Sequence, residues 1–315
     1  MARTKYPIHP DFKRWESFNP PLNETSIPIL QKLMSVLVLK EPITSKVPVE
    51  RKDIPVNSGE TVRALLYSPS NITPNAPCLI YFHGGGFVLP AGPFHYTLAK
   101  EYAMRANCKV LFVDYRLAPQ YPFPVAPEDC YAAYQWVLAS AEKFSIDPNR
   151  IAVGGDSAGG NLATVVCLMA RDRGLPIPCA QMMIYPVAGM KMATESMRIY
   201  TDTPMCNSKD ADKYDQFYMQ DSSAGKHEYY SPYEAKSLDR LPTTYIETAE
   251  FDCLRDGAIL YAERLSAFGV NVELHNTIGT IHGFDIVRKS PIVRDSIERR
   301  VDFLKKSFNI SSTRK

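Results

Sequence analysis

Eight short runs of apolar, β-prone residues recur along the chain and predict eight strands. These runs lie near residues 47–56, 61–67, 78–83, 109–113, 150–154, 180–186, 242–249 and 271–278. From the third run onward, most strands precede a segment with helical spacing of apolar positions, as in residues 161–171. Such alternation predicts a mostly parallel sheet covered by helices on both faces, and the first two runs predict an antiparallel edge.

Two segments depart from this alternation, residues 1–46 and residues 188–235. The first contains an apolar stretch from Ile27 to Leu39, interrupted by Gln31 and Lys32. This stretch is too short and too interrupted to span a bilayer, so we expect an amphipathic helix. The second segment is rich in methionine and aromatic residues, which suit an acyl pocket or simple helix packing equally well.

A serine lies in a turn between a predicted strand and a predicted helix. The sequence Gly155-Asp-Ser-Ala-Gly159 follows the apolar run Ile151–Val153 and has the G-x-S-x-G pattern. In this pattern the small flanking residues allow a strained turn that presents the serine hydroxyl above the sheet. Ser157 is therefore the predicted nucleophile, and the amide of Ala158, at the start of the helix, is a predicted oxyanion donor.

A glycine-rich loop follows another predicted strand, in the sequence His83-Gly-Gly-Gly86. Glycines allow the backbone to approach a substrate oxygen, because a Cβ atom there would occupy the space of the oxyanion. We predict that the amides of Gly84 and Gly85 complete an oxyanion hole. Together with Ser157, this loop predicts a serine hydrolase.

The general base should follow Ser157 in the chain, since enzymes with this strand-turn-helix serine motif have the chain order serine, acid, histidine. Three histidines follow it. His227 lies in a polar stretch, and His275 lies inside an alternating strand pattern, where its imidazole belongs to a sheet face. His282 lies in a loop just after that strand, which is where this fold places catalytic groups. His282 is the predicted base.

Three acidic residues follow the strand predicted at residues 242–249. Glu250 lies close to the strand, and Asp256 opens the next helix, where an acid commonly serves as a first-turn charge. Asp252 is therefore the predicted partner of the histidine.

These motifs resemble those of the hormone-sensitive-lipase family of α/β-hydrolases, in its bacterial esterase branch. The resemblance rests on His83-Gly-Gly-Gly-Phe-Val88, Asp114-Tyr-Arg-Leu-Ala-Pro119, Gly155-Asp-Ser-Ala-Gly-Gly-Asn161, Ala249-Glu-Phe-Asp252 and His282-Gly-Phe284, in the family's order. It covers roughly residues 47–308 and implies the same triad and oxyanion hole. One departure is Cys253, which replaces the proline that usually follows the acid.

The resemblance also implies an α/β-hydrolase fold with a helical cap. The expected organisation is an N-terminal cap segment, 1–46, and a catalytic domain, 47–315, with a cap insertion at about 188–235. Side chains expected to line the substrate pocket are Phe87, Met205 and Phe217.

The expected function is hydrolysis of soluble short-chain acyl esters through an acyl-enzyme intermediate, without a cofactor or metal. An amidase or arylformamidase would use the same triad, and only relative rates on matched esters and amides would separate the two. A receptor on this fold, like the gibberellin receptors that resemble this family, would lack the histidine, whereas His282 is present.

Charge and cysteine content argue against nucleic acid, an anionic membrane or a metal ion as a partner. The chain has 315 residues, with 36 basic and 34 acidic side chains and a net charge of +2, so no strong field attracts nucleic acid or an anionic membrane. The seven cysteines lack metal-ligand spacing and indicate free thiols in a reducing compartment. No secretory signal is visible, and we expect a cytoplasmic protein. The sequence leaves open whether the protein is a monomer or a homodimer.

Overall fold

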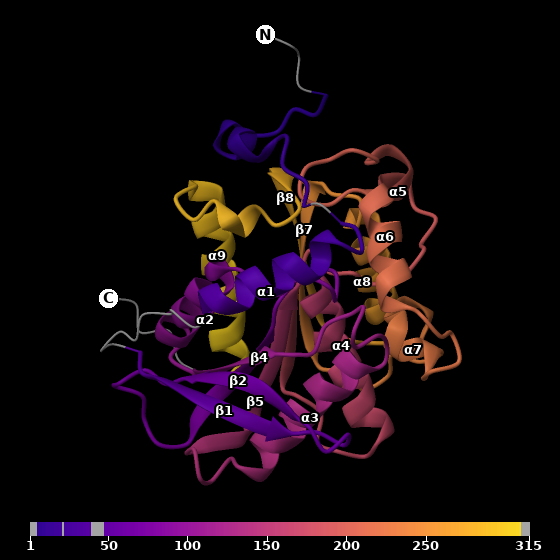
Figure 1. The fold of residues 1–315 in the computed structure, drawn as a ribbon. Coiled ribbons are helices and arrows are strands. Elements are labelled where there is room, and N and C mark those ends of the chain that lie inside the picture. Colours follow the sequence, from indigo (N-terminus) through magenta and orange to yellow (C-terminus); the bar gives the residue numbers. More distant parts are fainter. Residues whose placement is uncertain (1–4, 21, 39–46, 310–315) are drawn as a thin grey trace.

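The computed structural model describes residues 5–20, 22–38 and 47–309, and the described residues contain one eight-stranded sheet (Figure 1). The spatial order is β1-β2-β4-β3-β5-β6-β7-β8. The strands are β1 (Val49–Pro55), β2 (Thr61–Tyr67), β3 (Ala76–Phe82), β4 (Lys109–Asp114), β5 (Ile146–Asp156), β6 (Ala180–Ile184), β7 (Thr243–Phe251) and β8 (Val272–Ile281). β2 is antiparallel to β1 and to β4, and all other neighbours are parallel. The predicted antiparallel edge and parallel body are confirmed.

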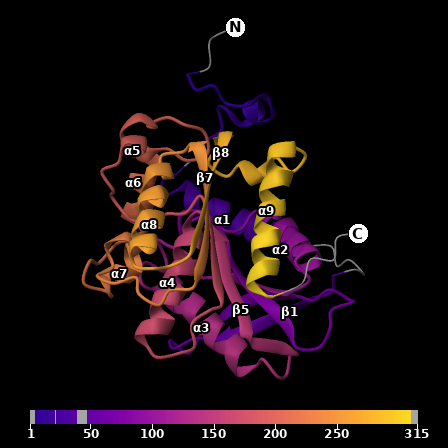
Figure 2. The same ribbon diagram turned by 180° about the vertical axis from the view of Figure 1, so that it is seen from behind.

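Helices cover both faces of the sheet (Figures 1 and 2). One face carries α2 (Pro93–Arg105) and α9 (Pro291–Ser307), and the other carries α3 (Val125–Ala139), α4 (Ala158–Asp172) and α8 (Arg255–Ala267). Successive strand residues point to opposite faces, so Leu79 joins the core under α2 and α9 while Ile80 joins the core under α3, α4 and α8. In the middle of the sheet the strands are buried on both sides, as in β3, whose seven residues are all buried, and this explains why β3 is continuously apolar.

The two segments outside the α/β alternation come together near the carboxyl ends of the central strands (Figure 1). The first includes the 3₁₀ helix η1 (Pro10–Trp15) and α1 (Ser26–Val38); the second includes α5 (Glu195–Ile199), α6 (Ser208–Tyr218), α7 (His227–Tyr230) and the 3₁₀ helix η2 (Pro232–Glu234). They contact each other directly, because the Met205 amide donates to the Phe18 carbonyl at 2.8 Å.

The helix expected at residues 27–39 is found as α1, with Leu39 and the rest of residues 39–46 outside the described residues. Its Ile27 is buried, and its Gln31 side chain donates to the carbonyls of Val88 and Ala118 at 2.8 and 3.0 Å. These bonds anchor α1 beside the glycine-rich loop, since Val88 lies two residues after Gly86. Within the described parts of the chain, no helix has both the length and the apolar character needed to cross a bilayer.

Candidate active site

Ser157 occupies a sharp turn between β5, which ends at Asp156, and α4, which begins at Ala158. Its backbone has φ 54° and ψ −117°, a conformation that side-chain-bearing residues rarely adopt. The turn is tight because helix and strand pack closely: a Cβ atom on Gly159 would lie 2.0 Å from the Phe82 carbonyl oxygen. The predicted strained turn is thus present, and it holds the serine at the carboxyl edge of the sheet.

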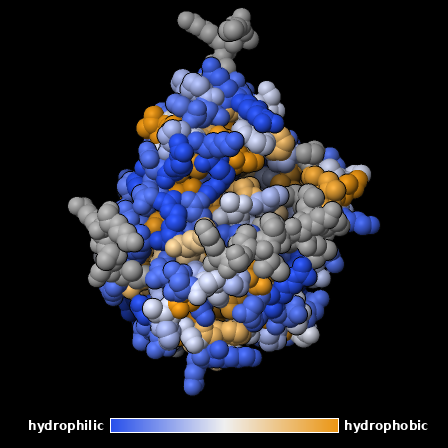
Figure 3. Space-filling model, turned by 90° about the vertical axis from the view of Figure 1, so that its left-hand side faces the viewer, coloured by the Kyte–Doolittle hydropathy of each residue, from blue (hydrophilic) through white to orange (hydrophobic). Residues whose placement is uncertain are grey.

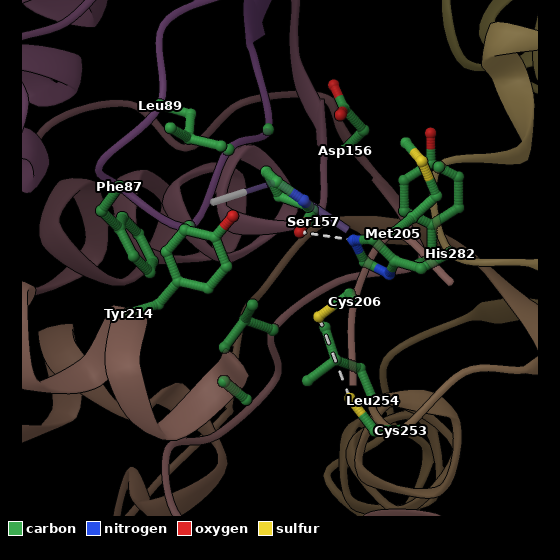
Figure 4. A pocket seen from close by; sticks show the side chains of 18 of the residues that line it. Phe87, Leu89, Asp156, Ser157, Met205, Cys206, Tyr214, Cys253, Leu254 and His282 are labelled. Atoms are coloured by element: carbon green, nitrogen blue, oxygen red, sulfur yellow. Dashed lines mark hydrogen bonds between the residues drawn. The ribbon is translucent and has the colours of Figure 1, made fainter. Parts of the chain in front are cut away.

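Three side chains from separate loops form a continuous hydrogen-bonded chain. Figure 4 shows the bond between two of them, Ser157 and His282. Nε2 of His282 lies 2.9 Å from Oγ of Ser157, and Nδ1 of His282 lies 2.7 Å from Oδ2 of Asp252. All three side chains are buried, with Asp252 fully inaccessible. The second oxygen of Asp252 accepts the amide of Leu254 at 2.9 Å, which orients the carboxylate. The arrangement has the geometry required for a nucleophile, a base and an orienting acid.

Burial and the neighbouring carboxylate act in opposite directions on His282. Burial disfavours the imidazolium, but the negative charge of Asp252 and the nearby Cys206 outweigh burial and raise the pKa of His282 to about 9. The site therefore stabilises a protonated imidazole strongly. That is the species formed when a histidine takes the proton of a serine hydroxyl.

The other candidates lie away from this chain of hydrogen bonds. His275 is on β8 and interacts with Glu273, as expected for a sheet-face residue, and the exposed His227 interacts with Glu234. Glu250 accepts the amide of Gly279 at 2.6 Å. Asp256 lies in the first turn of α8 and accepts the amide of Ser196 at 2.7 Å.

The glycine-rich loop passes close to the nucleophile turn and to its own next turn. A Cβ atom on Gly84 would lie 2.3 Å from Oδ2 of Asp156, and one on Gly85 would lie 2.3 Å from the Leu89 carbonyl oxygen. Gly85 also has a φ of 126°, which favours glycine. Gly84, Gly85 and Ser157 border the same cavity, and Ala158 follows Ser157 directly.

A cavity of about 470 Å³ opens beside Ser157. Two of the predicted pocket residues, Phe87 and Met205, line it, and the Phe87 ring stacks on Tyr218 at a centroid distance of 3.9 Å. The prediction for Phe217 is wrong: this side chain is absent from the lining and packs against the hydrophobic core. The reason is helical periodicity, because α6 turns a different face toward the cavity.

Several lining residues were not anticipated from the sequence. They include Leu89, Cys206, Tyr214, Cys253 and Leu254 (Figure 4). Tyr214 follows Ala211 by three positions and precedes Tyr218 by four, and all three line the cavity. That spacing is the signal that could have identified the correct face of α6.

Within the described ranges, no group of three or more His, Cys, Asp or Glu side chains is arranged to hold a metal ion. All seven cysteines are free thiols.

Comparisons with known proteins agree with this fold. A family model described as alpha/beta hydrolase fold matches residues 79–286. The chain is 35% identical to Carboxylesterase NlhH of Mycobacterium tuberculosis over 251 residues, which cover 78% of this chain and 79% of that protein. It is 33% identical to Ethyl acetate hydrolase of Pseudomonas putida over 243 residues, 76% of each chain. The solved structure of Bacterial Heroin Esterase is similar with a TM-score of 0.87 at 32% identity, covering 96% of this chain and 98% of that chain.

Proposed function

Because the chain belongs to the hormone-sensitive-lipase family of α/β-hydrolases and is a serine carboxylesterase, we propose that Ser157, His282 and Asp252 form its catalytic triad. One observation carries this proposal: the pair of hydrogen bonds that links the three side chains, at 2.9 and 2.7 Å. The strained backbone of Ser157 and the raised pKa of His282 support the same roles.

In this mechanism Oγ of Ser157 attacks the ester carbonyl carbon while Nε2 of His282 takes the hydroxyl proton. The carbonyl oxygen becomes negatively charged, and the amides of Gly84, Gly85 and Ala158 stabilise it. His282 then donates the proton to the leaving alcohol, which leaves an acyl group on Ser157. A water molecule, activated by the same imidazole, releases the acid. Asp252 accepts the hydrogen bond from the Nδ1–H group throughout, remains ionised, and thereby keeps Nε2 available.

The test is covalent labelling with a serine-directed phosphonate, followed by peptide mapping. The modified peptide should contain Ser157, and Ser157→Ala should abolish labelling and lower turnover by several orders of magnitude. The buried Ser196 provides a matched control, since it hydrogen-bonds to the Cys253 carbonyl outside the triad. Labelling that persists in Ser157→Ala would refute the assignment.

We further propose that the substrates are soluble esters with short acyl chains. The cavity has a volume typical of small-molecule sites and is lined mainly by apolar side chains. Residues up to 46 and residues 188–235 act as a cap on a catalytic domain spanning 47–315, and Phe18, Met205 and Tyr214 of the cap border the cavity. On the face seen in Figure 3, hydrophobic residues form small separate groups rather than a broad apolar surface of the kind that binds aggregated lipid.

Acyl preference is measured on p-nitrophenyl esters of increasing chain length. Each methylene that fits the cavity adds up to about 0.8 kcal/mol of transition-state binding, until the cavity ends. The value of kcat/KM should peak between acetyl and hexanoyl esters and fall for dodecanoyl esters. Faster hydrolysis of emulsified long-chain triacylglycerol would instead identify a lipase.

Two further proposals concern the oligomeric state of the protein and its location in the cell. A homodimer is supported by β8, which lies at the end of the sheet and exposes Leu274 (40%) and Ile278 (64%). Light scattering should report a dimer that Ile278→Lys converts to a monomer. A cytoplasmic location is supported by the seven free thiols, and cell fractionation tests it.

A further inference from the structure

Two cysteines approach each other beneath the candidate triad (Figure 4). Cys206 lies between α5 and α6, and Cys253 directly follows Asp252. Their sulfur atoms are 3.9 Å apart, and both residues are buried from bulk solvent yet border the substrate cavity. Ester hydrolysis uses neither thiol. The proximity therefore lacks an explanation in the reaction described above.

The surroundings of Cys206 differ from those of the other cysteines, whereas the hydrogen bond between the two sulfur atoms and burial both raise the pKa of its partner Cys253. Cys78, Cys108, Cys130 and Cys167 are buried in the core, where burial raises the pKa of each thiol. The pKa of Cys206 is instead lowered, because the Cys253 thiol donates to it and His282 lies nearby. A stabilised thiolate beside a second thiol is the arrangement found in redox-active cysteine pairs.

We propose that a hydroperoxide converts Cys206 and Cys253 into a reversible disulfide, and that this cross-link switches off the esterase. The Cys206 thiolate attacks the peroxide, the O–O bond breaks, and an alcohol leaves (water, for hydrogen peroxide), so that Cys206 becomes a sulfenic acid. The Cys253 sulfur then attacks the Cys206 sulfur, and water leaves as the S–S bond forms. Two thiols are oxidised and one peroxide is reduced, and the two thiol protons are carried away in the products.

The cross-link would act on the site because of what the two cysteines are attached to. A disulfide bond is about 2.05 Å long, so the sulfur atoms must approach each other by nearly 2 Å. Cys253 is joined by a peptide bond to Asp252, whose carboxylate orients His282. Cys206 follows Met205, whose amide donates a hydrogen bond to the Phe18 carbonyl. Oxidation would therefore pull the acid loop while fastening both cap segments to it.

The magnitude follows from the sensitivity of catalysis to position. A displacement of about 1 Å at reacting groups can lower a rate by about 100-fold. We expect the oxidised protein to lose on the order of tenfold or more in kcat/KM, and a thiol reductant to restore it. This effect on turnover rests on the proposed triad, whereas formation of the disulfide does not.

The experiment treats the reduced full-length protein with hydrogen peroxide and measures three properties of each sample. Non-reducing peptide mapping should find a Cys206–Cys253 linked peptide, kcat/KM should fall, and dithiothreitol should reverse both changes. Cys206→Ser and Cys253→Ala, each compared with its own untreated activity, should form no linked peptide and resist peroxide. Cys179→Ser is the matched control, since this partly exposed thiol lies outside the cavity, and it should respond like the unsubstituted protein.

Three results would overturn the proposal. The first is consumption of thiols without a linked peptide, and the second is a linked peptide without loss of activity. The third is an equal loss in Cys206→Ser that dithiothreitol does not reverse, which would indicate sulfoxidation of cavity methionines such as Met205. Phosphonate labelling of the reduced samples records separately whether Ser157 is the nucleophile, so failure of the triad assignment is distinguishable.

Discussion

Replacing Asp252 by Asn tests the electrostatic core of the site with a minimal change of shape. The carboxylate lies 2.7 Å from Nδ1 of His282 and is fully buried. The amide that replaces it has no net charge to stabilise the imidazolium. It can also turn its NH₂ group toward Nδ1, which would place the imidazole proton on Nε2, the wrong nitrogen.

The structure sets the expected magnitude. Despite burial, the pKa of His282 is about 9, compared with 6.5 for an ordinary histidine. This difference, to which Asp252 contributes most and Cys206 also contributes, corresponds to about 3 kcal/mol of imidazolium stabilisation, or roughly 300-fold in rate if it is fully expressed in the transition state. Loss of the correct tautomer adds to this, and the same substitution in a well-studied serine protease triad lowers kcat by about 10⁴-fold. We expect Asp252→Asn to lower kcat by a factor between roughly 300 and about 10⁴.

The assay is steady-state hydrolysis of p-nitrophenyl butyrate, with thermal unfolding measured on the same samples. Asp256→Asn is the matched control, because Asp256 has the same chemistry four residues later but binds the Ser196 amide and Arg255. It should retain most of the activity. If Asp256→Asn were the more damaging change while both variants remained folded, Asp252 would not be the triad acid.

Three further predictions follow from the same geometry. In the proposed mechanism His282 must be neutral, so kcat/KM should rise with pH through a midpoint above 6.5 and toward 9. Asp252→Asn should lower that midpoint. A midpoint below 6.5 in the unsubstituted enzyme would contradict the raised pKa of His282. Gly85→Ala places a Cβ atom 2.3 Å from the Leu89 carbonyl oxygen, so the backbone at position 85 must move. Because the Gly85 amide is a proposed oxyanion donor, its displacement should lower kcat by about 10²- to 10³-fold. Near-normal turnover would exclude Gly85 from the oxyanion hole. Tyr214→Ala should enlarge the cavity and move the chain-length optimum to longer esters, while Phe217→Ala should leave the optimum where it is; the opposite pattern would restore Phe217 to the pocket.

The proposed catalytic groups could be predicted from the sequence because each lies in a turn directly after a strand. Gly84, Ser157, Asp252 and His282 follow β3, β5, β7 and β8. Parallel strands bring their carboxyl ends to one edge of the sheet, so residues distant in sequence meet there once the strands are recognised. The parallel body and the antiparallel edge were predictable for the same reason, since the alternation of elements determines strand direction.

The lining of the cavity was decided only by the tertiary structure. Apolar periodicity marks a helix face as buried but does not distinguish burial against the core from exposure to an apolar cavity. For this reason the sequence predicts Phe217 as a pocket residue, whereas Tyr214 lines the cavity. The contact between Cys206 and Cys253 likewise joins residues 47 positions apart, from loops whose conformations depend on the packing of the cap. Local sequence thus determined which residues are proposed as the reacting groups, whereas the packing of distant segments determined the shape of the pocket and the position of the thiol pair beneath the site.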